Sequence, residues 1–410
     1  MNEYRNFTCG QLRAADAGKR VRLAGWVHRK RNLGNLCFVD LRDHYGITQC
    51  VFDSASPLFE KMQGIRVESV IGIDGEAVIR ENINKNIPTG EIEIKVDGLK
   101  VYSEAEVLPF QVAIEDDAPE EIRLKYRFLD LRKERIHKNI LLRSAVIERS
   151  RQLMREQGFT EYQTPILTAS SPEGARDFLV PSRLNPGKFY ALPQAPQPFK
   201  QLLMVSGFDK YFQIAPCFRD EDPRADRSPG EFYQMDMEMS FATQDDVFAV
   251  IEHTLGTIFN EFANGKKVDQ APFVRIPFRE AMMKYGSDKP DLRNPLRIMD
   301  VTEFFQSCTF NPFIGRTVRA IKVHAEMSKG FHEKLLSFAT SLGMGGLGYL
   351  EVAEDMSYKG PIDKFIPEEM KGELAEMAGL SAGDTIFFIA DKEDKANYYA
   401  GHIRTELGEK

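Results

Sequence analysis

The segment from Tyr211 to Phe241 concentrates residue types that could do chemistry. It reads YFQIAPCFRDEDPRADRSPGEFYQMDMEMSF, which predicts two strands joined by a charged loop. Side chains of a strand alternate between its two faces, and the second strand alternates polar and apolar residues. We therefore expect one polar face and one core face. The polar face holds Gln234, Asp236, Glu238 and Ser240, and the apolar face holds Tyr233, Met235, Met237, Met239 and Phe241.

The first strand adds a cation and a carboxylate to the same polar face. Gln213, Arg219 and Glu221 have the phase that places them beside the polar residues of the second strand. Charges held beside a core are costly unless they are paired or contact a ligand, and arginine suits bidentate contact with phosphate. A structural network of ion pairs would show the same pattern, but the charge of the loop favours a ligand site.

A second cation lies before these strands, on a short predicted helix. Pro198 opens the helix and Gly207 ends it, so Gln197 and Lys200 share one face. A lysine near the partial positive charge of a helix N-terminus suits an anionic ligand. A lysine in such a position is more often simply exposed, so both interpretations stay open from the pattern alone.

Length and charge limit the class of protein. A chain of 410 residues is too long for one ordinary core, so two or three domains are expected. The net charge of −7 argues against a general polyanion binder. A local basic run extends from Lys19 to Arg31, and on charge alone a strand edge protected by cations is the favoured interpretation. No apolar run could span a bilayer, no signal peptide is visible and five cysteines lack metal-like spacing, so we expect a cytoplasmic protein.

The elements before and after a linker differ in type. Five strand-like runs between Val21 and about Val101 fit an oligonucleotide-binding (OB) barrel, and other small barrels share this pattern. Prolines and the acidic run at 115–117 then mark a linker. The following segment predicts a buried amphipathic helix that ends at Gly158. Its expected core residues are Leu142, Ala145, Val146, Leu153 and Met154.

Two ordered motifs carry a resemblance to a known family. Phe218-Arg219-Asp220-Glu221 with its loop and returning strand resembles motif two of the class II aminoacyl-tRNA synthetases. GFTEYQTPILT resembles motif one, in which Pro165 ends a strand at the dimer interface of the family. SPEGARDFLVPSR and FYALPQAPQPFKQLLM closely resemble the bacterial aspartyl enzymes. The chain is therefore identified as similar to the bacterial-type aspartyl-tRNA synthetases.

The resemblance implies a multidomain α+β fold. Residues 1–107 would form an OB-fold β-barrel that binds the anticodon, and residues 108–137 a linker or hinge. The first part of the class II catalytic core, built on an antiparallel sheet, would occupy residues 138–294. Residues 295–410 resemble the α+β domain that is inserted in the bacterial enzymes.

The family also implies which residues bind aspartate. Glu173 would hold the ammonium group of the amino acid, and Gln197 and Lys200 would bind its side-chain carboxylate. Asp236 would orient Lys200 and contact the amino group. Arg219 would contact the substrate carboxylate.

ATP would lie beside the motif-two residues. Arg219 would bind the α-phosphate and stabilise the charge that develops there, with Glu221 at the adenine amino group and Asp220 in the same site. Phe232 would stack on adenine, although a core phenylalanine is a close alternative. Mg²⁺ would neutralise phosphate charge, and no protein metal ligands are expected in this chain.

Three barrel residues would recognise the tRNA anticodon. Phe38 would stack on an unpaired base, Gln49 would read a base edge, and Arg31 would contact the backbone or a base. Leu33 lies where members that charge only aspartate tRNA tend to carry leucine, so tRNA(Asp) is the expected partner and tRNA(Asn) stays open. The family implies a homodimer.

The implied function is that of an aspartate–tRNA ligase. Such an enzyme activates L-aspartate with ATP to aspartyl-adenylate and transfers the aspartyl group to the 3′ end of tRNA. The alternative is a non-catalytic tRNA-binding paralogue. The retained amino-acid pocket argues against it, and its residues are Glu173, Gln197, Lys200 and Asp236. A related asparaginyl or lysyl enzyme ranks last, because the SPEGARDFLVPS and PQAPQPFKQ segments and the insertion are bacterial aspartyl features.

Motif three of the family has no counterpart in this sequence. From about Pro295 onwards the chain resembles the insertion, and the histidine pair and acceptor-side carboxylates are also not found. Loss of one donor that stabilises the transition state can cost about 100- to 1000-fold in rate. We therefore expect this polypeptide to catalyse little or no ATP–pyrophosphate exchange when it is measured beside a complete homologue. Exchange at a comparable rate would contradict this expectation.

Overall fold

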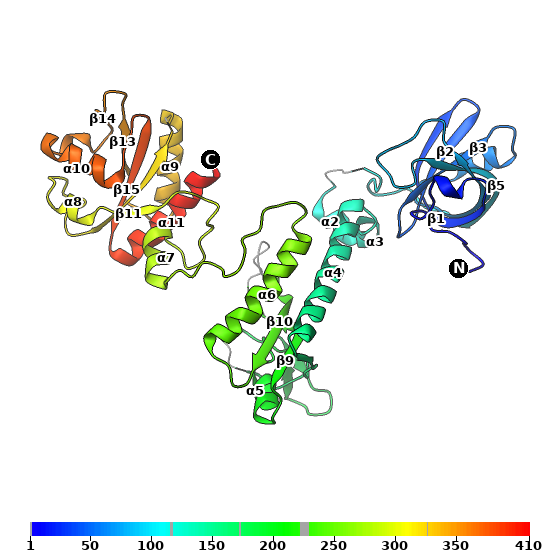
Figure 1. Cartoon of the computed structure of the whole chain (residues 1–410), viewed down its shortest axis with the longest axis horizontal. Coiled ribbons are helices and arrows are strands. Elements are labelled where there is room, and N and C mark those ends of the chain that lie inside the picture. Colours follow the sequence, from blue (N-terminus) through cyan, green and yellow to red (C-terminus); the bar gives the residue numbers. More distant parts are fainter. Residues whose placement is uncertain (1, 115–117, 172–173, 222–228, 326) are drawn as a thin grey trace. The chain divides into compact units, whose positions relative to one another are not determined.

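A computed structural model describes residues 2–114, 118–171, 174–221, 229–325 and 327–410. Packing divides the chain into two compact units, Met1–Ala271 and Pro272–Lys410 (Figure 1). The four domain ranges expected from the sequence, including the boundary after residue 294, stay predictions. Among the described residues, no helix is long and apolar enough to cross a membrane.

Five strands of the first unit close into a barrel. Alternate residues of each strand are buried inside it, which confirms the predicted alternation and the α+β fold with an N-terminal barrel. In the order β1-β2-β3-β5-β4 the strands are β1 (Arg20–Leu33), β2 (Leu36–Arg42), β3 (Ile47–Asp53), β5 (Ile92–Ser103) and β4 (Val70–Ile79). A short 3-10 turn, η1 (Ala14–Asp16), precedes them and helix α1 (Leu58–Gly64) follows β3.

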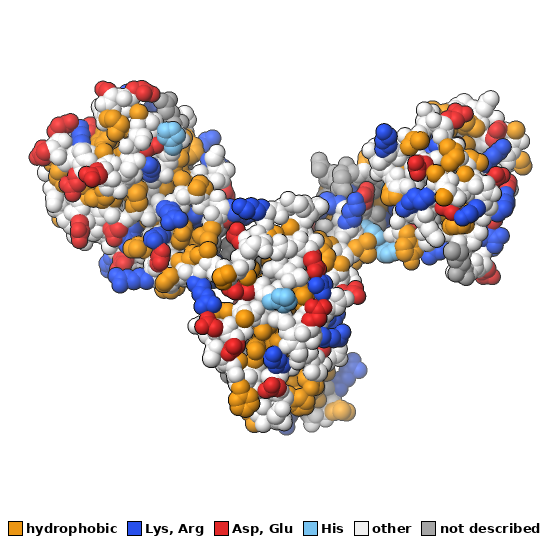
Figure 2. All heavy atoms as spheres, in the orientation of Figure 1, with side chains coloured by type: hydrophobic (Ala, Val, Ile, Leu, Met, Phe, Trp, Pro, Cys, Tyr) orange, Lys and Arg blue, Asp and Glu red, His pale blue; other side chains and the backbone are white. Residues whose placement is uncertain are grey.

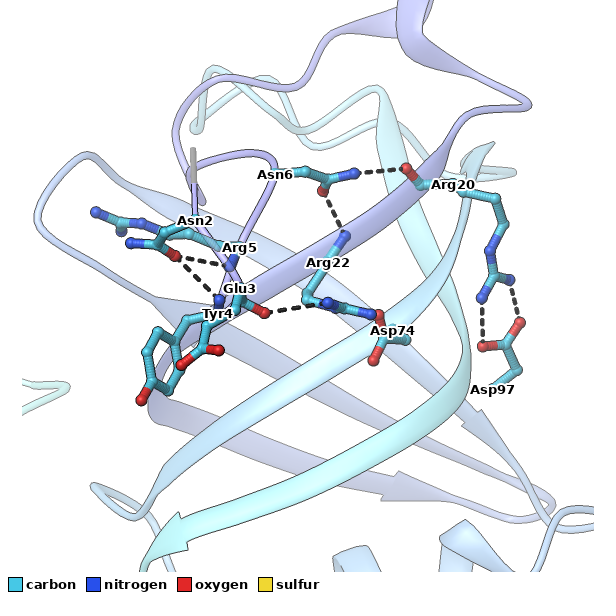
Figure 3. A network of polar contacts seen from close by, with 9 residues as sticks. All are labelled: Asn2, Glu3, Tyr4, Arg5, Asn6, Arg20, Arg22, Asp74 and Asp97. Carbon is cyan, nitrogen blue, oxygen red and sulfur yellow. Dashed lines mark hydrogen bonds and ion pairs between the residues drawn. The ribbon is translucent and has the colours of Figure 1, made fainter.

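Most of the basic run lies on β1, a strand of the closed barrel. β1 pairs with β4 through its first half, up to Trp26, and with β2 through its second half, so the interpretation as a strand edge protected by cations stays a prediction. Figure 3 shows Arg20 bonded to Asp97, and Arg22 bonded to Asp74 at 2.7 Å. Figure 2 shows basic and acidic side chains mixed over the visible face of the barrel. The first cations of the run are therefore neutralised by neighbouring strands.

A buried carboxylate fixes the linker to the barrel. Glu68 is 4% exposed and accepts two hydrogen bonds from Arg42, at 2.9 and 2.8 Å. Arg132, in the linker, donates to the same carboxylate at 3.0 Å, and its guanidinium lies 5.1 Å from the centre of the Trp26 ring. A buried carboxylate is destabilising when it loses a charged partner, so the contact of Arg132 with Glu68 holds the linker in one position on the barrel. The linker helices are α2 (Glu120–Lys125) and α3 (Arg127–Asp130).

The first unit continues into a small mixed sheet with two long helices packed against one of its faces. The strand order is β10-β9-β6, with β9 and β10 antiparallel and β6 parallel to β9. Met235, Met237 and Met239 pack against Met154 and Val250 of the two helices, which confirms the predicted apolar face at these positions. The elements are α4 (Glu134–Glu156), β6 (Thr160–Glu161), β7 (Leu179–Pro181), β8 (Phe189–Ala191), α5 (Gln197–Val205), β9 (Lys210–Phe218), β10 (Glu231–Met239) and α6 (Gln244–Phe262).

Three local predictions for this region are wrong. Phe241 is fully exposed with a φ of 53°, because β10 ends at Met239 and the backbone turns into the left-handed region. Helix α4 is not buried along its length, since its buried residues are Ser150, Leu153 and Met154 near its end, and Leu142 is 47% exposed. The motif-one strand ends at Glu161, well before Pro165.

The second unit is a five-stranded sheet covered on both faces. Ile386 and Phe388 of the central strand β15 belong to one apolar core, and Phe387 and Ile389 belong to the other. Helices α8 and α10 cover the first face, and α9 and α11 cover the second. The sheet order is β11 (Ile298–Asp300), β12 (Thr317–His324), β15 (Asp384–Asp391), β13 (Gly348–Val352) and β14 (Tyr358–Lys359). The helices are α7 (Phe278–Tyr285), α8 (Thr302–Gln306), α9 (Lys329–Ser341), η2 (Asp363–Phe365), α10 (Glu368–Ala378) and α11 (Glu393–Glu409).

Acid should destabilise the barrel through His28. Burial and then the charge of Arg42 lower the pKa of His28 to about 4, and Arg42 donates to its Nδ1 at 2.7 Å. The unfolded state takes up a proton near the usual pKa of 6.5 and the folded state does not, so stability falls as the pH drops from 6.5 towards 4. Between about pH 7 and about pH 4.5 we expect His28 to account for a loss of about 1–2 kcal/mol, reduced by solvent screening of a partly exposed ring.

The variant His28→Asn keeps an acceptor for Arg42 and cannot titrate. Urea unfolding of both proteins at the two pH values measures the effect, and the variant should lose less stability than the wild type. Equal losses in the two proteins would remove His28 as the cause.

Candidate active site and RNA-binding surface

Lys200 and two carboxylates form a half-buried ion-paired cluster between α5 and β10. The Lys200 Nζ lies 2.9 Å from Asp236 Oδ1 and 3.4 Å from Glu238 Oε2. The side chains of Lys200 and Asp236 are 12% and 10% exposed. The helix face and the strand face expected from the sequence are thus brought together.

The charges of this cluster suit a zwitterionic ligand. Burial alone would lower the pKa of Lys200, but its contacts with Asp236 and Glu238 outweigh burial and raise the pKa, so the ammonium stays charged. One cation then faces two carboxylates. Asp236 Oδ2 is buried and has no hydrogen-bond partner among the described residues. A ligand ammonium can therefore bind Asp236 while a ligand carboxylate binds Lys200.

Tyr211 is a member of the site that the sequence argument missed. Tyr211 lies on β9 opposite Glu238 of β10, and its buried hydroxyl lies close to Asp236 and Gln213. Burial and then the nearby charge of Asp236 raise its pKa, so the phenol stays a neutral donor. Tyr211 lies two residues before Gln213 on β9, so the alternation of the strand could have predicted that it lies on the polar face. Gln213 itself donates to Thr164 at 2.8 Å.

Arg219 extends the polar face beyond the end of β9. Its amide donates to the Gly230 carbonyl at 2.8 Å, and its guanidinium lies 5.0 Å from the centre of the Phe232 ring. The Arg219 Nε is buried with no hydrogen-bond partner among the described residues. Phe232 is half-buried against this cation. A cation with an unused donor beside an aromatic face can bind a phosphate next to a planar base.

The other predicted site residues lie around these two groups. Gln197 is half-buried at the start of α5, and Asp220 and Glu221 are exposed after β9. Glu173 lies outside the described residues. Phe232 and Asp236 share one face of β10 and are four positions apart, roughly 13 Å along a strand. The face therefore fits an extended ligand with two different ends.

Arg31, Phe38 and Gln49 lie together on the barrel. Arg31 is opposite Phe38 in the β1–β2 pair, and its Nη2 donates to Gln49 Oε1 at 3.1 Å. Gln49 Nε2 donates to Glu93 Oε2 at 2.7 Å, so the orientation of the amide is fixed by two partners. Arg31 also lies 3.3 Å from Asp40. Asp40 and Glu93 were not predicted, although Asp40 shares the phase of Phe38.

Comparison with known proteins identifies the family. Residues 119–395 match the family described as tRNA synthetases class II (D, K and N), and residues 21–102 match the OB-fold nucleic acid binding domain. The chain belongs to the class II tRNA synthetases. The match at residues 21–102 also confirms that the barrel of this class II synthetase is an OB fold.

Curated relatives of this class II synthetase cover its whole length. The Aspartate--tRNA(Asp/Asn) ligase of Rickettsia bellii (strain OSU 85-389) is 56% identical over 419 residues, which cover 100% of this chain and 69% of the relative. The protein of the same name from Acidiphilium cryptum is 57% identical over 417 residues, with 100% and 70% covered. The chain thus spans about two thirds of the length of these relatives.

Solved structures show the same fold at low identity. Asparaginyl-tRNA synthetase from Pyrococcus horikoshii, complexed with asparaginyl-adenylate, has a TM-score of 0.61 at 20% identity and covers 97% of this chain and 95% of its own. Aspartyl tRNA synthetase from Entamoeba histolytica has a TM-score of 0.56 at 19% identity, with 95% and 87% covered. At such identity these structures support the fold alone.

Proposed function

We propose that this class II synthetase is an aspartate–tRNA ligase. The carrying observation is Lys200 held between Asp236 and Glu238, a cluster that matches an amino acid with an anionic side chain. The names of the relatives support aspartate as the substrate. Those names also include asparagine tRNA, so the proposal takes tRNA(Asp) as the first partner and tRNA(Asn) as a second, against the pattern at Leu33.

In this proposal the site binds two substrates end to end. Lys200, with Gln197, binds the side-chain carboxylate of L-aspartate, and Asp236, with Glu173, binds its ammonium group. Arg219 bridges the α-carboxylate and the α-phosphate of ATP, with Asp220 beside it, Glu221 at the adenine amino group and Phe232 on the ring. These assignments are supported by the shared face of β9 and β10.

The reaction follows from the charges that Arg219 faces. A carboxylate oxygen of aspartate forms a bond to the α-phosphorus while the bond to pyrophosphate breaks, and the guanidinium stabilises the negative charge that builds up there. Mg²⁺ enters as part of the substrate Mg·ATP, where it neutralises phosphate charge. In the described part of the chain, no group of three or more His, Cys, Asp or Glu side chains could hold a metal.

Assembly and RNA binding complete the proposal. The exposed apolar start of α4, where Ile140 is 48% and Leu142 is 47% exposed, supports a homodimer in which a second copy covers this helix. Beside it a groove of about 420 Å³ is lined by Leu142, Val146 and Tyr233. A cytoplasmic location is part of the same proposal.

The barrel would bind the anticodon through Arg31, Phe38 and Gln49.

Replacing Lys200 tests the amino acid site. Lys200→Met keeps the stem but removes the charge and leaves Asp236 beside Glu238, so the affinity for L-aspartate should fall about 10- to 100-fold. Calorimetric titration of the 410-residue chain measures it. The variant should also lose the preference of the wild type for L-aspartate over L-asparagine.

The exposed Lys188 provides the matched control. Lys188→Met should bind like the wild type. An unchanged preference in a folded Lys200→Met protein would contradict the proposed substrate.

Replacing Phe38 tests the RNA site. Loss of one stacked base costs about 1–3 kcal/mol, so Phe38→Leu should bind tRNA(Asp) about 5- to 150-fold more weakly. Filter binding at fixed salt measures this change. Tyr102→Leu removes an exposed aromatic outside the predicted set and should bind as the wild type does. If both variants bind equally well, Phe38 does not stack on the RNA.

A further inference from the structure

Gln194 makes a two-point contact with the backbone of Ala175. Its Oε1 accepts a hydrogen bond from the Ala175 amide at 3.2 Å, and its Nε2 donates to the Ala175 carbonyl at 3.0 Å. Gln194 is buried, with 3% of its surface exposed. A buried amide that bonds both the N–H and the carbonyl of one residue holds that residue as a neighbouring strand would.

The same amide holds a second point of the segment. Gln194 Nε2 also donates to Asp177 Oδ1, and the other oxygen of Asp177 accepts a hydrogen bond from Ser170. Gln194 and Asp177 therefore fix the chain on both sides of residues 171–174. Glu173, the proposed ammonium ligand, falls in this interval of the sequence.

Residues 175–178 connect the two halves of the proposed site. The Arg176 carbonyl accepts a hydrogen bond from the Asp220 amide at 2.9 Å, next to Arg219. The Phe178 carbonyl accepts one from the Leu192 amide at 2.9 Å. Gln194 stands three residues before Gln197 and six before Lys200. The bridge thus joins the approach to α5 with the loop that follows β9.

We propose that Gln194 is a positioning residue, which sets the bridge at 175–178 so that the ammonium group of the amino acid is recognised. This inference rests on the proposed function. Gln194 itself does not contact the reacting atoms. An apolar side chain of similar size would fill the same space but would leave the Ala175 amide and carbonyl unbonded, so the amide chemistry is required.

A purely structural role and the proposed role predict different ligand selectivity. Succinate has the two carboxylates of aspartate and no ammonium group. If Gln194 positions the recognition of the ammonium group, Gln194→Ala should weaken L-aspartate binding about 10-fold and change succinate binding less than about 2-fold. General damage to the fold would weaken both ligands together.

The experiment titrates L-aspartate and succinate into the 410-residue chain and its variants by calorimetry. Gln194→Glu keeps the shape and the acceptor but loses both donated hydrogen bonds, so it should act like Gln194→Ala and serves if that variant does not fold. The double variant Asp177→Asn with Gln194→Glu restores a donor and an acceptor between the two positions and should recover part of the selectivity. Gln201→Ala, on the exposed side of α5, is the matched control.

The outcomes separate this inference from the proposed function. Selectivity lost in both single variants and partly regained in the double variant supports it. Unchanged selectivity, or an equal loss for both ligands, overturns it and leaves the function standing. A wild-type chain that binds succinate as well as L-aspartate overturns the proposed function instead.

Discussion

The ion pair of Lys200 with Asp236 is the contact on which the arrangement of the active site depends. Both groups are nearly buried, and a buried charge is tolerated only beside a partner of opposite charge. The pair therefore fixes where α5 lies against β10. The same register places Tyr211 opposite Glu238 and puts Phe232 on the face that Asp236 occupies. The ion pair thus sets the helix against the strand that carries the aromatic end of the site.

The alternation of residues in β9 and β10 was the most informative part of the sequence. Period-two patterning depends only on the geometry of a strand, so it correctly placed Gln213 and Asp236 on the same face, and the structure shows that they lie directly opposite each other. The pattern wrongly predicted that Phe241 lies on the core face, because it does not show where the backbone leaves the strand. It also could not show that α4 is exposed at its start, since an apolar helix face looks the same whether it meets a core or a surface.

Contacts between distant segments were beyond the sequence. The five barrel strands follow from local pattern and turn residues, and the predicted span from Val21 to about Val101 agrees closely with the observed span from Arg20 to Ser103. The bond from Gln194 to Ala175 and the bond from Gln49 to Glu93 join segments that no periodicity relates. Polar side chains that hold backbone or other side chains in place therefore had to be found in the structure. The family resemblance supplied ligand-contacting residues but not the residues that support them.

The central strand of the second unit has a consequence for how that unit unfolds. Consecutive residues of β15, from Ile386 to Ile389, enter the two cores in turn. Neither layer of helices can detach without exposing one side of this strand to water. The two layers are thus thermodynamically coupled, and the unit should melt in a single cooperative transition rather than layer by layer.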